Sequence, residues 1–191
     1  MKKIVLLIMA LMTAACFAGC GNGNSDTSND NAATDNLSEC TSFTGIIEPE
    51  QLISKETAET LVGNALQEGE KSEQEVVGQK IIFYAPADED DLDALYFQIS
   101  LTQEAFMPSD SVNTPTSIYE TFEDVEIDAG TLEPVEGIGE RAMFFTPGIY
   151  ILTHGYHIVI AVGNSDDPQV REILKEAGAL AVQNLEQIVN P

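Results

Sequence analysis

Hydrophobic and polar positions divide the 191-residue chain into three parts. An apolar run covers residues 4–18, a polar stretch rich in Gly, Asn, Ser and Asp covers 21–42, and apolar residues recur at regular intervals from Phe43 onwards. The last part is long enough for one domain with a hydrophobic core. The polar stretch cannot bury enough apolar surface to offset the entropy of ordering it, so we expect a disordered tether there.

Periodic apolar positions predict helices near both ends of the domain. Ser54 is expected to cap a helix over residues 55–67, and Asp167 to cap a longer one that begins at Pro168. A short helix is expected after Thr114. The apolar stripe of the last helix is formed by Val170, Ile173, Leu174, Ala177, Ala181, Leu185 and Ile188.

Alternating and β-branched segments predict five strands. Their ranges are 76–85, 94–102, 141–146, 148–153 and 156–163. The first two are expected to pair antiparallel, and only His154-Gly155 separates the last two, which is the length of a tight hairpin loop. The order of elements predicts a single α+β domain over 43–191, with a largely antiparallel sheet packed by an N-terminal and a long C-terminal helix.

The N-terminal run has the composition of an export signal. Lys2 and Lys3 precede an apolar stretch of about 15 residues that ends in Phe17-Ala18-Gly19-Cys20. A helix that spans a membrane needs about 20 apolar residues, so this segment is not expected to be a permanent anchor.

This segment resembles the lipobox of bacterial, Gram-positive-type lipoproteins, which ends in two small residues and a cysteine. The resemblance implies a diacylglyceryl thioether on Cys20, cleavage between Gly19 and Cys20, and attachment to the extracytoplasmic face of the cell membrane. Residues 1–19 would then be the lipoprotein signal peptide, and 20–42 the lipidated cysteine and its tether. Two alternatives remain open: Cys16 as the lipobox cysteine, and ordinary cleavage that yields a soluble secreted protein.

The formal charge of −24 limits the classes of partner. Such a chain repels nucleic acid and anionic lipid headgroups, so no nucleic-acid partner is expected. It attracts cations and basic partners over long distances. The densest acidic run, 88–93, is either a solvated hairpin loop or a Ca²⁺ site. Because it lacks the central Gly and the ligand spacing of a calcium loop, we expect the solvated loop and no metal site.

Three further motifs are expected to be structural. Cys40 lacks an intramolecular partner if Cys20 is lipidated, so it is either free or paired between molecules. His154 and His157 are expected to be solvent-exposed, because a zinc site would need at least one more ligand. The run 137–142 fits the G-x-G-x-x-A dinucleotide fingerprint, yet a strand follows where that motif needs a helix, so we expect turn glycines and no cofactor.

Two segments, 52–63 and 135–142, are similar to small Gram-positive lipoproteins of unknown function with a PsbP-like α+β fold. Relatives of this kind often pair two cysteines, a feature that Cys40 alone does not reproduce, and they supply no catalytic residues. Gly-x-Ser-x-Gly, Ser-x-x-Lys and His-Glu-x-x-His are absent from the sequence. We therefore expect a non-enzymatic binding or accessory module of the cell envelope, with the membrane and an envelope protein as partners. The alternatives are a cation-binding or sensor domain and a small envelope enzyme.

Overall fold

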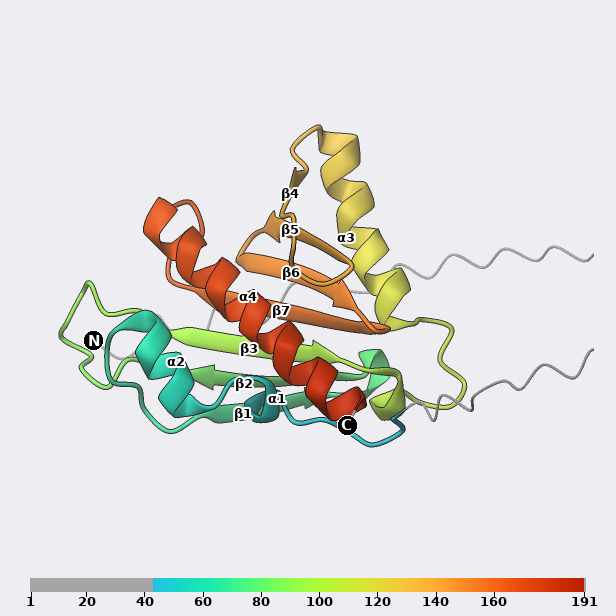
Figure 1. The fold of residues 1–191 in the computed structure, drawn as a ribbon, viewed down its shortest axis with the longest axis horizontal. Helices are drawn as coiled ribbons and strands as arrows, with labels where there is room; N and C mark the ends of the chain where they lie inside the picture. Colours follow the sequence, from blue (N-terminus) through green and yellow to red (C-terminus); the bar gives the residue numbers. More distant parts are fainter. Residues whose placement is uncertain (1–42, 191) are drawn as a thin grey trace, which may run out of the picture. The chain divides into compact units, whose positions relative to one another are not determined.

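Seven strands form one antiparallel sheet, in the spatial order β1-β2-β3-β7-β6-β5-β4. The computed structural model describes residues 43–190 (Figure 1). The strands are β1 Glu70–Gln74, β2 Gln79–Tyr84, β3 Phe97–Thr102, β4 Glu133–Pro134, β5 Arg141–Phe145, β6 Gly148–Thr153 and β7 Tyr156–Val162. The helices are α1 Pro49–Leu52, α2 Lys55–Val62, α3 Pro115–Ala129 and α4 Pro168–Val189, with 3₁₀ turns η1 Glu75–Val77 and η2 Glu104–Phe106. The α+β fold expected from the sequence is confirmed.

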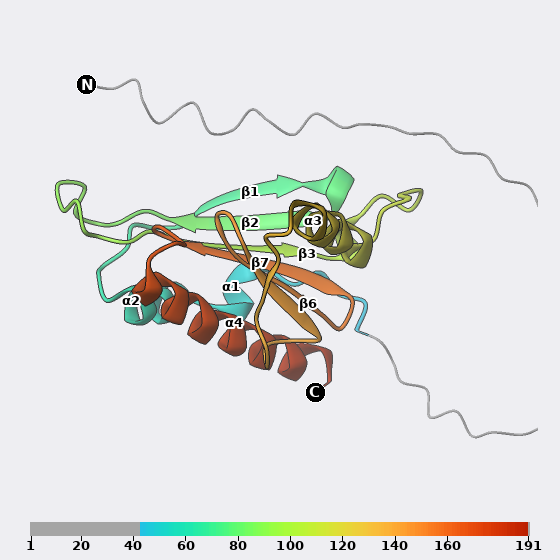
Figure 2. The same ribbon diagram turned by 90° about the horizontal axis from the view of Figure 1, so that it is seen from above.

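Helices cover both faces of the sheet, one face more extensively than the other. Figure 2 shows α1, α2 and α4 beneath one face, whereas α3 lies on the other. The larger core is formed between α4 and the sheet and includes the fully buried Ile99, Ile149, Ile151, Ile158, Ile160, Leu174 and Leu185. A smaller cluster beside α3 contains Tyr119, Met143, Tyr150, Leu152 and Val159. The sheet therefore has one extensively covered face and one partly covered face.

The C-terminal helix begins and packs as its sequence predicts. Asp167 is the N-cap, and its carboxylate accepts a hydrogen bond from the backbone N–H of Gln169 at 2.7 Å. Pro168 occupies the first turn, where its missing N–H costs nothing. The predicted stripe faces the sheet: Val170, Leu174, Ala177, Ala181 and Leu185 are buried, and Ile173 and Ile188 pack against the core.

The predicted hairpin is also present. Thr153 pairs with Tyr156, so His154 and Gly155 form the two-residue loop between β6 and β7, both with positive φ. That backbone geometry matches the twist of the flanking strands. Strands β2 and β3 pair antiparallel as expected, with Tyr84 opposite Phe97.

Two predicted helix ends were wrong, and strand β1 was not predicted. The helix expected over 55–67 ends at Val62, because Gly63 adopts φ +76° and its N–H caps the carbonyl of Glu59. The helix after Thr114 is not short: it has 15 residues, Pro115–Ala129, and Gly130 caps its end. Strand β1 was missed because its five residues, EKSEQ, contain no apolar side chain. Pairing with β2 makes this segment a strand, and its charges protect an outer edge of the sheet.

A buried polar clasp holds the N-terminal segment of the domain. The side chain of Gln103, at the end of β3, is fully buried. Its amide donates to the Ile47 carbonyl and accepts from the Ile47 N–H, each at 2.8 Å. Nearby, Lys80 on β2 contacts Glu48 at 2.8 Å and Glu73 at 2.6 Å. These interactions fix the chain to the sheet just before α1 begins.

Candidate functional site

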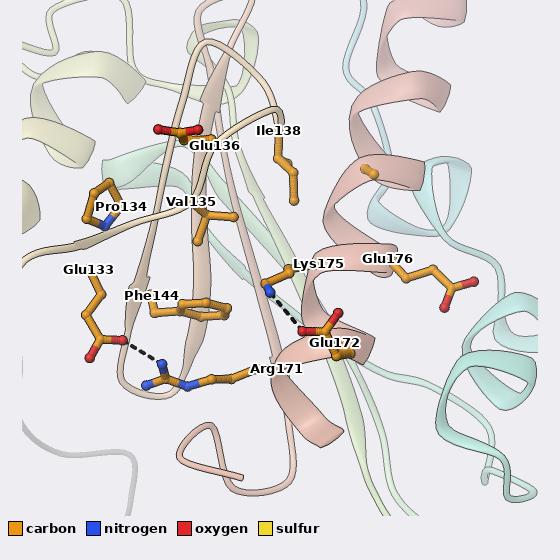
Figure 3. A pocket seen from close by; sticks show the side chains of 11 residues that line it. Glu133, Pro134, Val135, Glu136, Ile138, Phe144, Arg171, Glu172, Lys175 and Glu176 are labelled. Atoms are coloured by element: carbon orange, nitrogen blue, oxygen red, sulfur yellow. Dashed lines mark hydrogen bonds and ion pairs between the residues drawn. The ribbon is translucent and has the colours of Figure 1, made fainter. Parts of the chain in front are cut away.

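A groove lies between the N-terminal half of α4 and the segment that leaves β4. Its volume is about 680 Å³. The side chains that line it, drawn in Figure 3, are apolar (Pro134, Val135, Ile138, Phe144, Ala179), acidic (Glu133, Glu136, Glu172, Glu176) and basic (Arg171, Lys175). The groove thus combines an apolar surface with many charged groups.

The helical period of α4 builds one wall. Arg171, Lys175 and Ala179 follow one another at intervals of four residues, which places them on one face of the helix. The other wall is the turn after β4, where the Val135 N–H donates to the Ala142 carbonyl at 2.8 Å. Ile138 lies close to Gly178 of α4, where an added Cβ would come within 3.3 Å of the Ile138 methyl group. The nearest atom to such a Cβ would be Ile151 Cδ1 of β6, at 2.9 Å, so the glycine mainly allows α4 to pack closely on the sheet.

Arg171 connects the two walls. Its guanidinium lies 2.7 Å from the Glu133 carboxylate and 4.7 Å from the centre of the Phe144 ring. Figure 3 shows Arg171 extending from α4 toward both side chains. Its Nε also donates to the Ser165 carbonyl at 2.9 Å. The guanidinium therefore has protein partners on several sides and serves to hold β4 against α4.

The charge that remains in the groove is negative. Lys175 contacts Glu172 at 2.8 Å, so both basic side chains of the groove have carboxylate partners. Glu136 and Glu176 form no ion pair with any residue in 43–190. Two unpaired carboxylates beside an apolar surface suit a ligand that carries positive charge next to an apolar group. The lining residues include no Ser, Cys or His that could form a nucleophile–base pair.

The structure corrects the prediction for His157. Its side chain is not solvent-exposed: the residue is 2% exposed, and neither Nδ1 nor Nε2 has a hydrogen-bond partner among the described residues. Burial lowers the pKa of the imidazole to about 4, so the ring is neutral at pH 7. Strand β7 turns this residue toward the face that α3 covers, and the position of α3 was not predictable from the H-x-x-H spacing.

His154 is exposed in the β6–β7 loop, as predicted, and its Nε2 lies 3.6 Å from a Glu186 carboxylate oxygen. The two histidines are not brought together into a site. Within residues 43–190, no cluster of three or more His, Cys, Asp or Glu side chains is arranged to hold a metal ion.

The other sequence candidates fall into two groups. Residues 88–93 form an exposed loop between β2 and β3, where Asp88 and Asp91 each accept a hydrogen bond from the backbone two residues later. The loop is exposed, and the choice between a solvated loop and a Ca²⁺ site is left to the calcium titration described below. Gly137 and Gly139 lie in a turn with positive φ, and strand β5 follows them, as expected of turn glycines. The remaining candidates lie outside the described residues: Cys16, Gly19, Cys20, Cys40 and the tether.

Sequence reasoning missed the groove, although one signal was present. The chain has only eight Lys and Arg residues, and two of them stand four residues apart on the polar side of α4. Because basic residues are scarce in this chain, the spacing of Arg171 and Lys175 on one helix face was the sequence signal that could have pointed to the groove.

Among residues 43–190, no helix is both long enough and apolar enough to span a membrane. Comparisons of this chain with protein-family models, with curated proteins and with solved structures found no match.

Proposed function

We propose that this chain is a lipoprotein of the cell envelope, anchored at Cys20 on the extracytoplasmic face of the cell membrane, whose domain acts as a binding or accessory module. The sequence around the cysteine supports the anchor: a basic start, a short apolar run and Ala18-Gly19 before Cys20. A diacylglyceryl group supplies two acyl chains, and two chains hold a protein on a membrane stably where one does not.

The groove between α4 and the turn after β4 is the observation that carries the binding role. It offers an apolar surface at Phe144 and Ile138 with the unpaired carboxylates of Glu136 and Glu176 beside it. The partner that fits is a segment of an envelope protein in which basic side chains flank an apolar one. The domain's acidic surface would steer such a segment toward the groove, more weakly as ionic strength rises.

The anchor is tested by the mass of the N-terminal peptide and by the Cys20→Ala variant, with Cys16→Ala as the matched control. We expect lipid mass on Cys20, and loss of membrane attachment only in the Cys20 variant. A mature N-terminus elsewhere, or attachment that survives Cys20→Ala, would refute the anchor.

The groove is tested with a photo-reactive amino acid at Ala179, and at Ala129 on α3, which is also exposed, as control. In cells that make the full chain, we expect a discrete adduct from position 179 and none from 129. Glu136→Lys combined with Glu176→Lys should abolish the adduct, whereas the α3 change Glu126→Lys should leave it. Equal adducts from both positions, or an adduct that survives the charge reversal, would refute a groove-bound basic partner.

A further inference from the structure

Helix α3 is attached to the sheet through only part of its length. Its buried residues, Pro115 and Tyr119, lie in the first two turns. Toward its C-terminal end, Val125 and Ile127 are 53% and 54% exposed. A helix with few buried contacts belongs to the least stable part of a fold and separates from the rest at low cost in free energy.

The docked part of α3 covers His157. The imidazole lies among three aromatic rings, with centroid distances of 5.7 Å to Tyr119, 6.1 Å to Phe122 and 5.5 Å to Tyr150. The first two rings belong to α3, and Tyr150 belongs to β6. Both ring nitrogens lack a hydrogen-bond partner among the described residues. Burial of a polar group without hydrogen-bond partners is rare and costs free energy, so the imidazole lowers the stability of the docked helix.

The charged groups near the imidazole are paired with one another, and none of them forms a hydrogen bond with its ring. On α3, Glu120 and Glu123 are both paired with Arg141 of β5, with Glu120 at 3.1 Å. The Arg141 guanidinium also lies 5.0 Å from the centre of the Tyr119 ring. The cross-strand neighbours of His157 are Thr102 on β3 and Leu152 on β6, neither of which carries charge.

The two tyrosines that contact the imidazole also stay neutral. Burial raises the pKa of both Tyr119 and Tyr150 to about 12. The two tyrosines therefore supply no negative charge to an imidazolium in the docked state.

We propose that α3 is a cover that acid releases: protonation of His157 disfavours the docked helix and exposes the aromatic surface of β5, β6 and β7. The neutral ring packs among Tyr119, Phe122 and Tyr150 as an aromatic side chain. The charged ring would be an unpaired cation in an apolar cluster, and it regains water only when α3 leaves the sheet.

Proton linkage determines in which direction pH shifts the docking of α3. The pKa of His157 is about 4 in the docked state and near its ordinary value of 6.5 when the ring is exposed. The undocked state binds more protons between these values, so docking is strongest above pH 6.5 and weakens as the pH falls toward 4. Between pH 7.5 and pH 5 the docking equilibrium should shift about 30-fold toward release.

Hydrogen–deuterium exchange on the full chain in detergent micelles tests this directly, with rates corrected for intrinsic pH dependence. We expect the protection of the amides in 115–129 to fall about 30-fold from pH 7.5 to pH 5, while α4 stays protected. Protection of α3 that does not change with pH would overturn the proposal.

The variant His157→Phe keeps an aromatic ring and removes the titration, with His154→Phe as the matched control at the exposed histidine. We expect α3 protection to become independent of pH only in the His157 variant. A wild-type response in His157→Phe would overturn the proposal. NMR titration of the wild-type imidazoles gives a second measurement that needs no variant. If His157 titrates near pH 6.5 while α3 remains protected, the docked state tolerates the charge and the proposal fails.

Discussion

Replacing Gln103 should test the clasp that fixes the N-terminal segment to the sheet. Gln103→Leu has nearly the same volume, so it opens no large cavity. It does leave the N–H and the carbonyl of Ile47 without partners in a fully buried position. Each buried backbone group that loses its hydrogen bond costs about 1–3 kcal/mol. We therefore expect the free energy of unfolding to fall by about 2–6 kcal/mol.

Gln103→Glu separates the donor from the acceptor of the same amide. The ionised carboxyl group still accepts from the Ile47 N–H, but it faces the Ile47 carbonyl without a proton to donate. The protonated form restores both hydrogen bonds, so burial and the carbonyl raise the pKa of the new group in the folded state. A group with a raised folded pKa stabilises the fold at low pH and loses that contribution as the pH rises. The deficit of this variant relative to wild type should therefore be smaller at pH 4 than at pH 7.

Urea unfolding at both pH values, followed by far-UV circular dichroism, measures these differences. Gln98→Leu on β3 is the control, because Gln98 is only half-buried and forms no side-chain hydrogen bond within residues 43–190. A Gln103→Leu cost below about 0.5 kcal/mol, or a Gln103→Glu deficit that is equal at pH 4 and pH 7, would show that the clasp does not hold the segment.

Leu174→Ala in α4 should cost about 2–5 kcal/mol in urea unfolding, because the side chain is fully buried against the sheet; a cost below about 0.5 kcal/mol would contradict that packing. Limited proteolysis should cut within 21–42 and leave 43–191 folded; resistance of the tether would count against its disorder. Calcium titration should raise stability gradually through screening of the 88–93 loop, as monovalent salt does. A saturable, Ca²⁺-preferring rise that Asp90→Asn abolishes would instead establish a cation site.

The strongest local patterns were the ones that predicted structure correctly. Helix α4 combines an N-cap, a proline in the first turn and a long apolar stripe, and its start was placed at the correct residue. The β6–β7 hairpin was found because its loop has only two residues. Strand β1 carries no such pattern, since its conformation comes from pairing with β2 and not from its own side chains.

The two candidate sites depend on contacts between distant segments. Strand β7 is buried almost throughout, so alternation could not indicate what covers His157. That answer required the position of α3, some 40 residues earlier in the chain. In the groove, Glu133 likewise contacts Arg171, although the strands β5, β6 and β7 lie between these two residues in the sequence. Patterns within a short window predict elements, and they carry little information about which elements meet.

Helix α4 gives the domain two functionally different ends. Near its C-terminal end, the Asn184 side chain donates to the Leu52 carbonyl at 2.7 Å, so the first part of the described chain is fastened there. Arg171 lies about 20 Å away along the helix axis, at 1.5 Å per residue, and the groove extends from Arg171 to Ala179. In Figure 1 the start of the described chain lies on the β1–β3 side of the sheet, and β4 lies at the opposite edge. The segment around Leu52 is therefore held at the end of α4 opposite to Arg171, and a partner that contacts Arg171 does not compete with the contact between Asn184 and Leu52.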